Sequence, residues 1–188
     1  MTAVIYMSKA TQKTDQHFAV MDSPIGRLGI LADARGIAEI RFPNNLSKDF
    51  LNKNASLPST SLSTATNETK KAEGFIEQAI DQLQAYFDGR LSTFDLPLSL
   101  GGTDFQNAVW AQLQNIPYGK TASYKDIAIA VGNPKASRAI GMANNKNRIP
   151  IVIPCHRIIG SDGSLTGFAG GLDTKRWLLK REGHVATV

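Results

Sequence analysis

The pattern of apolar residues changes halfway along the chain, and this change limits the possible folds more than any other feature. Up to about residue 100, short strand patterns precede one long amphipathic helix pattern; after residues 100–103 (Leu-Gly-Gly-Thr), short helical segments separated by turns dominate. A glycine-rich break between two such patterns marks a domain boundary. The 188 residues are enough for two small domains with cores of their own. We therefore expect an α/β (α+β) protein with two domains, residues 1–100 and 101–188.

The first domain is predicted to combine a small β meander with one helix. Three short runs of strand-forming residues are joined by turn sequences: residues 17–22, 28–32 and 37–42. Residues 52–69 consist mostly of Ser, Thr and Asn, which predicts a surface loop. Apolar residues at helical spacing then predict a helix over 70–88, with Gly89 as its stop. Residues 94–98 can return to the sheet.

The second domain begins with a pattern typical of a helix-turn-helix. Thr103 can cap a helix that runs to about Asn115, residues 117–120 form a turn, and Ser123 can cap a helix that runs to Ala130. Asn133 can cap the next helix, with Pro134 at its first position. Two short helices joined by a tight turn that contains glycine are typical of a DNA-binding helix-turn-helix, although the pattern also arises by chance.

The rest of this domain is predicted to contain a buried extended run over 149–153 and a final helix over 173–182. No apolar run approaches the ~20 residues that a membrane helix needs. Residues 1–16 lack the apolar stretch of a secretory signal. We therefore expect a globular protein of the cytoplasm that does not enter a membrane.

The positive charge is concentrated in the second half. The chain carries a net charge of +5, but residues 1–100 hold 10 Lys/Arg and 11 Asp/Glu, for −1. Residues 101–188 hold 11 Lys/Arg and 5 Asp/Glu, for +6. The second domain is therefore suited to meet a polyanion such as DNA, although charge alone is weak evidence of a partner.

The chain has one cysteine, Cys155, which excludes an intramolecular disulfide and argues against a structural zinc site. A lone cysteine is most often a small buried hydrophobe. Its neighbours, Pro154-Cys155-His156-Arg157, offer another interpretation. A thiol attacks as thiolate, a nearby imidazole can take its proton, and a carboxylate can orient the imidazole. Adjacent Cys and His side chains diverge in an extended chain, so their cooperation would need a tight turn.

The segment around Cys155 resembles the active site of the O6-alkylguanine-DNA alkyltransferases, also called methylated-DNA–protein-cysteine methyltransferases. The similarity extends to further segments of the second domain: residues 118–120, 123–124, 132–141, 147, 149–150, 167–172, 177–179 and 182–183. The close match covers residues 104–184. The first half is similar more weakly, through residues 23–26, the meander and the helix. The resemblance implies a ribonuclease-H-like N-terminal domain and a C-terminal DNA-binding and alkyltransferase domain.

The resemblance also assigns roles to individual residues. Cys155 corresponds to the alkyl acceptor, His156 to its general base acting through a water, and Glu182 to the group that orients His156. Asn147 corresponds to the residue that braces the turn presenting the cysteine. Tyr124 corresponds to the tyrosine that favours nucleotide rotation and hydrogen-bonds the departing base.

A second set of residues corresponds to the DNA-binding helix and the base pocket. Arg138 matches the finger that enters the duplex in place of the flipped base, with Ala136 and Ser137 beside it on the DNA-binding surface. The base pocket would be formed by the following residues: Ile158, Phe168, Ala169 and Gly170. Phe168 and Ala169 stand where some family members have Tyr and Ser, and this departure puts the detailed base preference in doubt.

The resemblance implies repair of double-stranded DNA by direct reversal of damage. The alkyl group would pass from O6-alkylguanine, and also from O4-alkylthymine, to Cys155 in one irreversible turnover after base flipping from the minor groove. The family needs no cofactor for this transfer, no metal is expected in this chain, and a monomer is expected. Two rival classes remain: a non-catalytic protein that binds alkylated DNA, and a cysteine hydrolase. A plain helix-turn-helix regulator would have no use for the run Pro154-Cys155-His156-Arg157.

Overall fold

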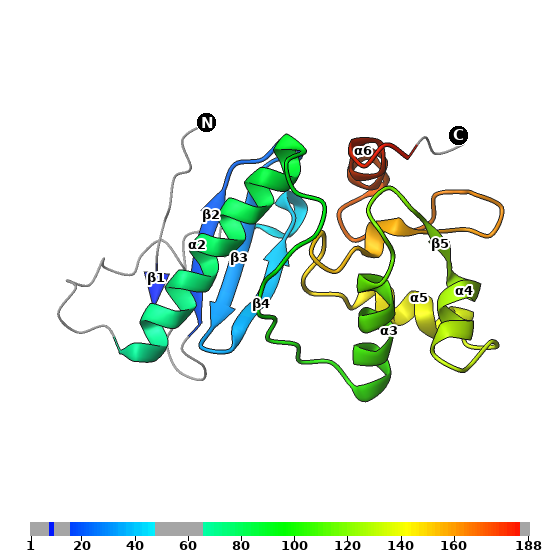
Figure 1. Ribbon diagram of the computed structural model, residues 1–188, viewed down its shortest axis with the longest axis horizontal. Coiled ribbons are helices and arrows are strands. Elements are labelled where there is room, and N and C mark those ends of the chain that lie inside the picture. Colours follow the sequence, from blue (N-terminus) through cyan, green and yellow to red (C-terminus); the bar gives the residue numbers. More distant parts are fainter. Residues whose placement is uncertain (1–7, 10–15, 48–65, 185–188) are drawn as a thin grey trace. The chain divides into compact units, whose positions relative to one another are not determined.

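The computed structural model describes residues 8–9, 16–47 and 66–184. The chain divides into two compact units, Met1–Leu100 and Gly101–Val188 (Figure 1). The first unit holds a sheet and one long helix, and the second is mostly helical, so the protein is of the mixed α/β class that the sequence predicts. No helix in the described part of the chain has both the length and the apolar character needed to cross a membrane.

The first unit is built on a four-stranded antiparallel sheet in the order β1-β2-β3-β4. Its strands are β1 (Ser8–Lys9), β2 (His17–Met21), β3 (Leu28–Asp33) and β4 (Gly36–Arg41). The three predicted strands are confirmed, and β1 is an addition. A short 3-10 helix, η1 (Pro43–Asn45), follows β4. Every residue of β2 and β3 is buried, and the long helix α2 lies against the sheet (Figure 1).

Helix α2 (Asn67–Asp88) begins earlier than the sequence predicts. The side chain of Thr66 accepts a hydrogen bond from the amide of Thr69, so a threonine cap starts the helix within the segment predicted as loop. Residues 67–69 are therefore helical, and residues 52–65 of that predicted loop lie outside the described residues. The predicted stop is confirmed, because Gly89 takes a left-handed conformation with φ of 77°.

Residues 94–98 return to the sheet at a single point. Leu98 forms an isolated parallel bridge with Ile37. The Ile37 amide donates to the carbonyl of Pro97 at 2.8 Å, and the Ser99 amide donates to the carbonyl of Ile37 at 2.8 Å. The expected return is therefore confirmed as a bridge and not as a full strand.

The second unit contains four α-helices, a 3-10 helix and a short parallel strand pair among its described residues. These elements are α3 (Asp104–Gln114), β5 (Ala122–Ser123), α4 (Tyr124–Ala130), α5 (Ser137–Asn145), η2 (Cys155–Arg157), β6 (Ile158–Ile159) and α6 (Leu172–Arg181). The predicted caps Thr103 and Ser123 are confirmed, and each forms a capping box with the residue three positions on. The indole of Trp110 donates to the carbonyl of Ala143 at 2.9 Å and so ties α3 to α5.

The helix-turn-helix is formed by α4 and α5, but its second helix starts later than predicted. The amide of Ala136 donates to the carbonyl of Asn133 at 2.9 Å, so residues 133–136 close a turn. Ala136 is the N-cap of α5, without a side-chain cap, and Ser137 is its first residue. Asn133 and Pro134 therefore belong to the turn and do not cap the helix. Helix α6 also starts and ends one residue earlier than predicted.

Candidate active site

Residues 149–153 form a tight buried turn, and the prediction of an extended run is wrong. The amide of Ile153 donates to the carbonyl of Ile149 at 2.9 Å, which folds the segment back on itself. Ile151 has a φ of 76°, a conformation that a β-branched residue rarely adopts, and its side chain is fully buried. Such a conformation costs on the order of 1–3 kcal/mol and persists only when surrounding contacts hold it. Local propensity favours a strand here, and tertiary packing overrides it.

Asn147 braces this turn from both sides. Its Nδ2 donates to the carbonyl of Ile153 at 2.8 Å, and its Oδ1 accepts from the amide of Ile149 at 3.0 Å. The side chain is 9 % exposed, so both bonds are shielded from water. The turn leads through Pro154 directly into η2, where Cys155 is the first residue. Asn147 thus connects the end of the helix-turn-helix to the segment that carries the thiol.

The thiol of Cys155 is buried and has several groups that can stabilise its charged form. Burial raises the pKa of Cys155 to about 11, while a hydrogen bond from Asn147, the charge of Lys175 and the amides of residues 155 and 156 act in the opposite direction. The thiol is therefore protonated at rest. A transfer reaction must take its proton away at the moment of attack.

His156 follows Cys155 in the same 3-10 turn and is completely buried. Its Nε2 lies 2.8 Å from Oε1 of Glu182. Because an ionised carboxylate can only accept, Nε2 carries the hydrogen. Burial lowers the pKa of His156 more than the neighbouring carboxylate raises it, so the ring is neutral at pH 7. Its Nδ1 is then an acceptor, and among the described residues it has no hydrogen-bond partner.

Glu182 accepts hydrogen bonds from three different residues. Besides His156, Arg157 donates to it twice, from Nε to Oε2 at 2.8 Å and from Nη2 to Oε1 at 3.0 Å. The amide of Gly119 donates to Oε2 at 3.1 Å. Burial alone would raise the pKa of Glu182, but the bonds from His156 and Arg157 outweigh it and lower this pKa to about 2. Glu182 is therefore ionised at neutral pH.

Two partners of Glu182, Arg157 and Gly119, are not predicted from the sequence. Arg157 is buried, donates from Nη1 to the carbonyl of Ile116 at 2.6 Å, and lies over the ring of Tyr118 at 5.9 Å. Gly119 has a φ of 73°, and a Cβ at this position would lie 2.7 Å from the main-chain oxygen of Glu182. The turn at residues 117–120 is predicted correctly, but its contact with a residue 63 positions away has no local signal.

Lys175 is the other group that the sequence analysis misses. It is completely buried on α6, and its Nζ donates to the carbonyls of Ile158 and Thr166. Burial lowers the pKa of Lys175 to about 8, against a smaller opposing effect from Cys155. Lys175 lies three and four residues before Leu178 and Leu179, on the apolar face of its helix. That spacing is the signal that could have identified it as a buried lysine.

Tyr124 and the expected base-pocket residues lie in the same unit as the thiol. Tyr124 is the first residue of α4 and is partly exposed, and its hydroxyl oxygen accepts a hydrogen bond from Thr166 at 3.0 Å. Ile158 is fully buried in β6 directly after η2. Phe168 and Gly170 are partly exposed, and Ala169 is exposed, in the segment between β6 and α6.

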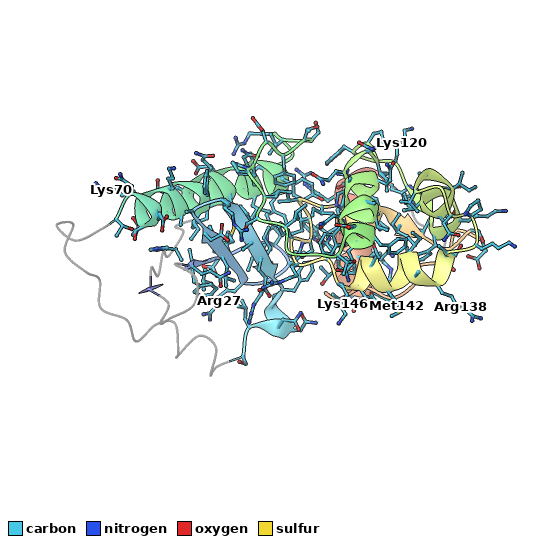
Figure 2. All side chains as sticks on the ribbon, turned by 90° about the horizontal axis from the view of Figure 1, so that it is seen from below. Arg27, Lys70, Lys120, Arg138, Met142 and Lys146 are labelled. Atoms are coloured by element: carbon cyan, nitrogen blue, oxygen red, sulfur yellow. The ribbon has the colours of Figure 1, made fainter. Side chains whose placement is uncertain are left out.

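Helix α5 presents a positively charged surface. Arg138, Met142 and Lys146 lie on one side of it (Figure 2), and Met142 is 70 % exposed. Arg138 is exposed at the second position of the helix. Ala136 and Ser137, at the start of α5, are partly exposed and present no bulky side chain. The helix can therefore approach a polyanion closely with its backbone and place cations at both ends.

Taken together, these residues can carry out one sequence of steps. A buried thiol can give up its proton, a neutral imidazole can accept it, and an ionised carboxylate can stabilise the resulting imidazolium. Every member of this set lies among residues 101–188, as does the charged surface of α5. The arrangement suits attack by sulfur on an electrophile delivered by a polyanion.

Each of the two units matches a known protein-family model. Residues 17–100 match the family model described as the ribonuclease-like domain of 6-O-methylguanine DNA methyltransferase. Residues 104–184 match the family model described as its DNA binding domain. The two matched segments account for most of the chain.

Individual relatives match over nearly the whole chain. The methylated-DNA–protein-cysteine methyltransferase of Methanosarcina barkeri is 46 % identical over 168 residues, which is 88 % of this chain and 96 % of that protein. The protein of the same name from Mycobacterium tuberculosis is 43 % identical over 88 % of this chain and 92 % of its own. The crystal structure of Mycobacterium tuberculosis OGT in complex with DNA is similar with a TM-score of 0.71 and 41 % identity, covering 87 % of this chain and 90 % of that one. The chain belongs to the 6-O-methylguanine DNA methyltransferase family.

Proposed function

We propose that this protein repairs DNA by moving an alkyl group from O6 of guanine onto Cys155 in a single irreversible turnover. Relatives named methylated-DNA–protein-cysteine methyltransferase, at 42–46 % identity over 88 % of the chain or more, support this activity. The Mycobacterium tuberculosis relative whose structure contains DNA supports DNA as the partner.

One observation carries the proposal: a buried cysteine is followed by a buried histidine whose two ring nitrogens have different surroundings. Nε2 donates to Glu182, while Nδ1 has no partner among the described residues and can accept a proton. A structural histidine would normally have both nitrogens satisfied. His156 is therefore suited to act as the base for Cys155, through one water molecule, with Glu182 orienting the ring.

The reaction balances without a cofactor. The proton of Cys155 passes to Nδ1 of His156, and the sulfur forms a bond to the alkyl carbon. The bond between that carbon and O6 breaks, and its electron pair stays on the guanine. The base then takes up one proton and the imidazolium of His156 releases the one it accepted, so the thiol proton is replaced in the protein by the alkyl group. The thioether is stable to water, which limits each molecule to one turnover.

Duplex DNA hides the target atom, so the damaged nucleotide must rotate out of the helix. This costs a few kcal/mol, and less for a poorly paired base. We assign α5 to the minor groove, with Ala136 and Ser137 close to the backbone and Arg138 filling the place of the rotated base. Tyr124 would then hydrogen-bond the leaving base. O4-alkylthymine offers a similar alkyl-oxygen bond and is a second expected substrate.

The flipped base would be received by four residues of the segment after η2: Ile158, Phe168, Ala169 and Gly170. Ala169 brings no side-chain donor, so amides of the main chain serve in its place. We assign residues 1–100 to the ribonuclease-like domain and residues 101–188 to the DNA-binding and alkyltransferase domain. The family resemblance further supports a monomer that acts in the cytoplasm.

The proposal is tested by the intact mass of the protein after incubation with a duplex oligonucleotide that contains one O6-methylguanine. We expect a gain of one methylene group per protein molecule, located in the Cys155 peptide and stopping at one equivalent. Cys155→Ala should gain no mass and still bind the duplex. Binding by the wild type without a mass gain would favour a non-catalytic alkylated-DNA-binding protein, and repeated turnover of an acyl substrate would favour a cysteine hydrolase.

A further inference from the structure

A chain of hydrogen bonds connects the tyrosine expected to contact the base with the buried lysine near the thiol. Thr166 is its central residue. The Oγ1 of Thr166 donates to the hydroxyl oxygen of Tyr124 at 3.0 Å, and the carbonyl of Thr166 accepts from Nζ of Lys175 at 3.0 Å. Lys175 also donates to the carbonyl of Ile158. None of the proposed reaction steps uses Thr166.

The direction of the bond between Thr166 and Tyr124 matters for the chemistry. A phenol can donate one hydrogen and accept through its oxygen. Since Thr166 is the donor, the oxygen of Tyr124 is an acceptor and its own hydrogen remains available. Across the described segments, Tyr124 has no acceptor for that hydrogen. The hydrogen of the Tyr124 hydroxyl is therefore available to a base that binds beside it.

We propose that Thr166 is a positioning residue, whose hydroxyl turns the O–H of Tyr124 toward the leaving base during alkyl transfer. The inference rests on the proposed function. The free O–H would otherwise rotate about its C–O bond and could point away from the base. A hydrogen bond accepted by the phenol oxygen also makes its O–H a stronger donor, since linked hydrogen bonds polarise one another. Both effects favour departure of the negatively charged base.

The surroundings of Thr166 keep its hydroxyl in place. Threonine is stiff about its first side-chain torsion because its Cβ is branched. Its main chain is tied through Lys175 to Ile158, the first residue after the turn that carries Cys155. Tyr124 is fixed from the other side, as the first residue of a helix with a complete capping box. The donor, the acceptor and the thiol therefore belong to one connected framework.

The test is the single-turnover rate of methyl transfer from a duplex containing O6-methylguanine, measured at saturating protein. We expect Thr166→Val, which keeps the shape and removes the hydroxyl, to lower this rate by about fivefold with unchanged DNA affinity. Thr166→Ser, which keeps the hydroxyl, should restore most of the rate. Ser164→Ala is the matched control, because Ser164 lies in the same segment and its hydroxyl bonds to Asp162 instead.

A double-mutant cycle with Tyr124→Phe separates positioning from a general structural effect. Once the phenol hydroxyl is gone, Thr166→Val should cost nothing further. An equal loss in both backgrounds, or a Thr166→Ser variant as slow as Thr166→Val, would overturn the inference while the wild type still accepts its methyl group. A wild type that accepts no methyl group would overturn the proposed function, and the inference with it.

Discussion

Replacing Glu182 by Gln should destabilise the second unit by roughly 3 kcal/mol at pH 7. The pKa of Glu182 falls from 4.5 to about 2 in the folded protein, because the bonds from His156 and Arg157 outweigh the effect of burial. At about 1.4 kcal/mol for each pKa unit, this shift corresponds to roughly 3 kcal/mol of folding free energy. The same loss viewed from Arg157, which stays buried without its counter-charge, typically costs about 3–5 kcal/mol, so the two estimates of this one interaction agree.

The sign of the pH dependence follows from the direction of the shift. A carboxylate whose pKa is lower in the folded state stabilises the fold at pH values above its unfolded pKa. This contribution is lost as the pH falls through the folded value. The difference between wild type and Glu182→Gln should therefore be complete at pH 5 and above, and should shrink between about pH 5 and pH 2. A protonated Glu182 then carries no charge, like the glutamine of the variant.

Urea unfolding followed by tryptophan fluorescence measures this difference at several pH values. Both tryptophans, Trp110 and Trp177, lie in the second unit, so the signal reports on the unit that contains Glu182. Asp173→Asn is the control, since Asp173 pairs with Arg176 at 2.7 Å on the same helix but is fully exposed. Its effect should be close to zero, because water and salt screen an exposed ion pair. A Glu182→Gln deficit that is the same at pH 3 and pH 7, or no larger than that of the control, would refute the reasoning.

Two further predictions concern the reaction. If Arg138 fills the space left by the rotated base, as proposed, Arg138→Ala should slow repair of duplex DNA by at least about tenfold and leave the reaction with free O6-benzylguanine nearly unchanged. Equal losses with both substrates would argue against that role. Lys175→Met should slow the reaction with free O6-benzylguanine between pH 6 and 7.5, since the charge of Lys175 lowers the pKa of Cys155. The difference in rate between the variant and the wild type should narrow above about pH 8, where the wild-type lysine loses its own charge. A pH–rate profile identical to that of the wild type would contradict the electrostatic role.

Elements with strong local signals are predicted well from the sequence. The strands β2, β3 and β4, the caps at Thr103 and Ser123, and the stop at Gly89 all agree with the structure. Each depends on side chains that act within a few residues: alternation with turn chemistry, a hydroxyl that accepts an amide hydrogen, or a glycine that tolerates positive φ. The start of α5 is predicted less well, because Asn133 and Pro134 fit a turn as readily as a helix cap.

The apolar run 149–153 shows where local reasoning fails. Its β-branched residues favour a strand, yet Ile151 adopts a positive φ in a turn that Asn147 braces. The same limit applies to Lys175, which belongs to a helix rich in charged residues and is nevertheless completely buried. In both cases the contacts that decide the conformation come from residues brought close by folding.

The sequence by itself determined the family, the candidate nucleophile and the basic character of the second half, because these depend on which residues are present and in what order. Only the tertiary structure decided that His156 and Glu182, 26 residues apart, are 2.8 Å from each other, and that Arg157 and Gly119 hold the same carboxylate. Ionisation is set by burial and by the groups within a few ångströms, and both arise only when distant segments pack together.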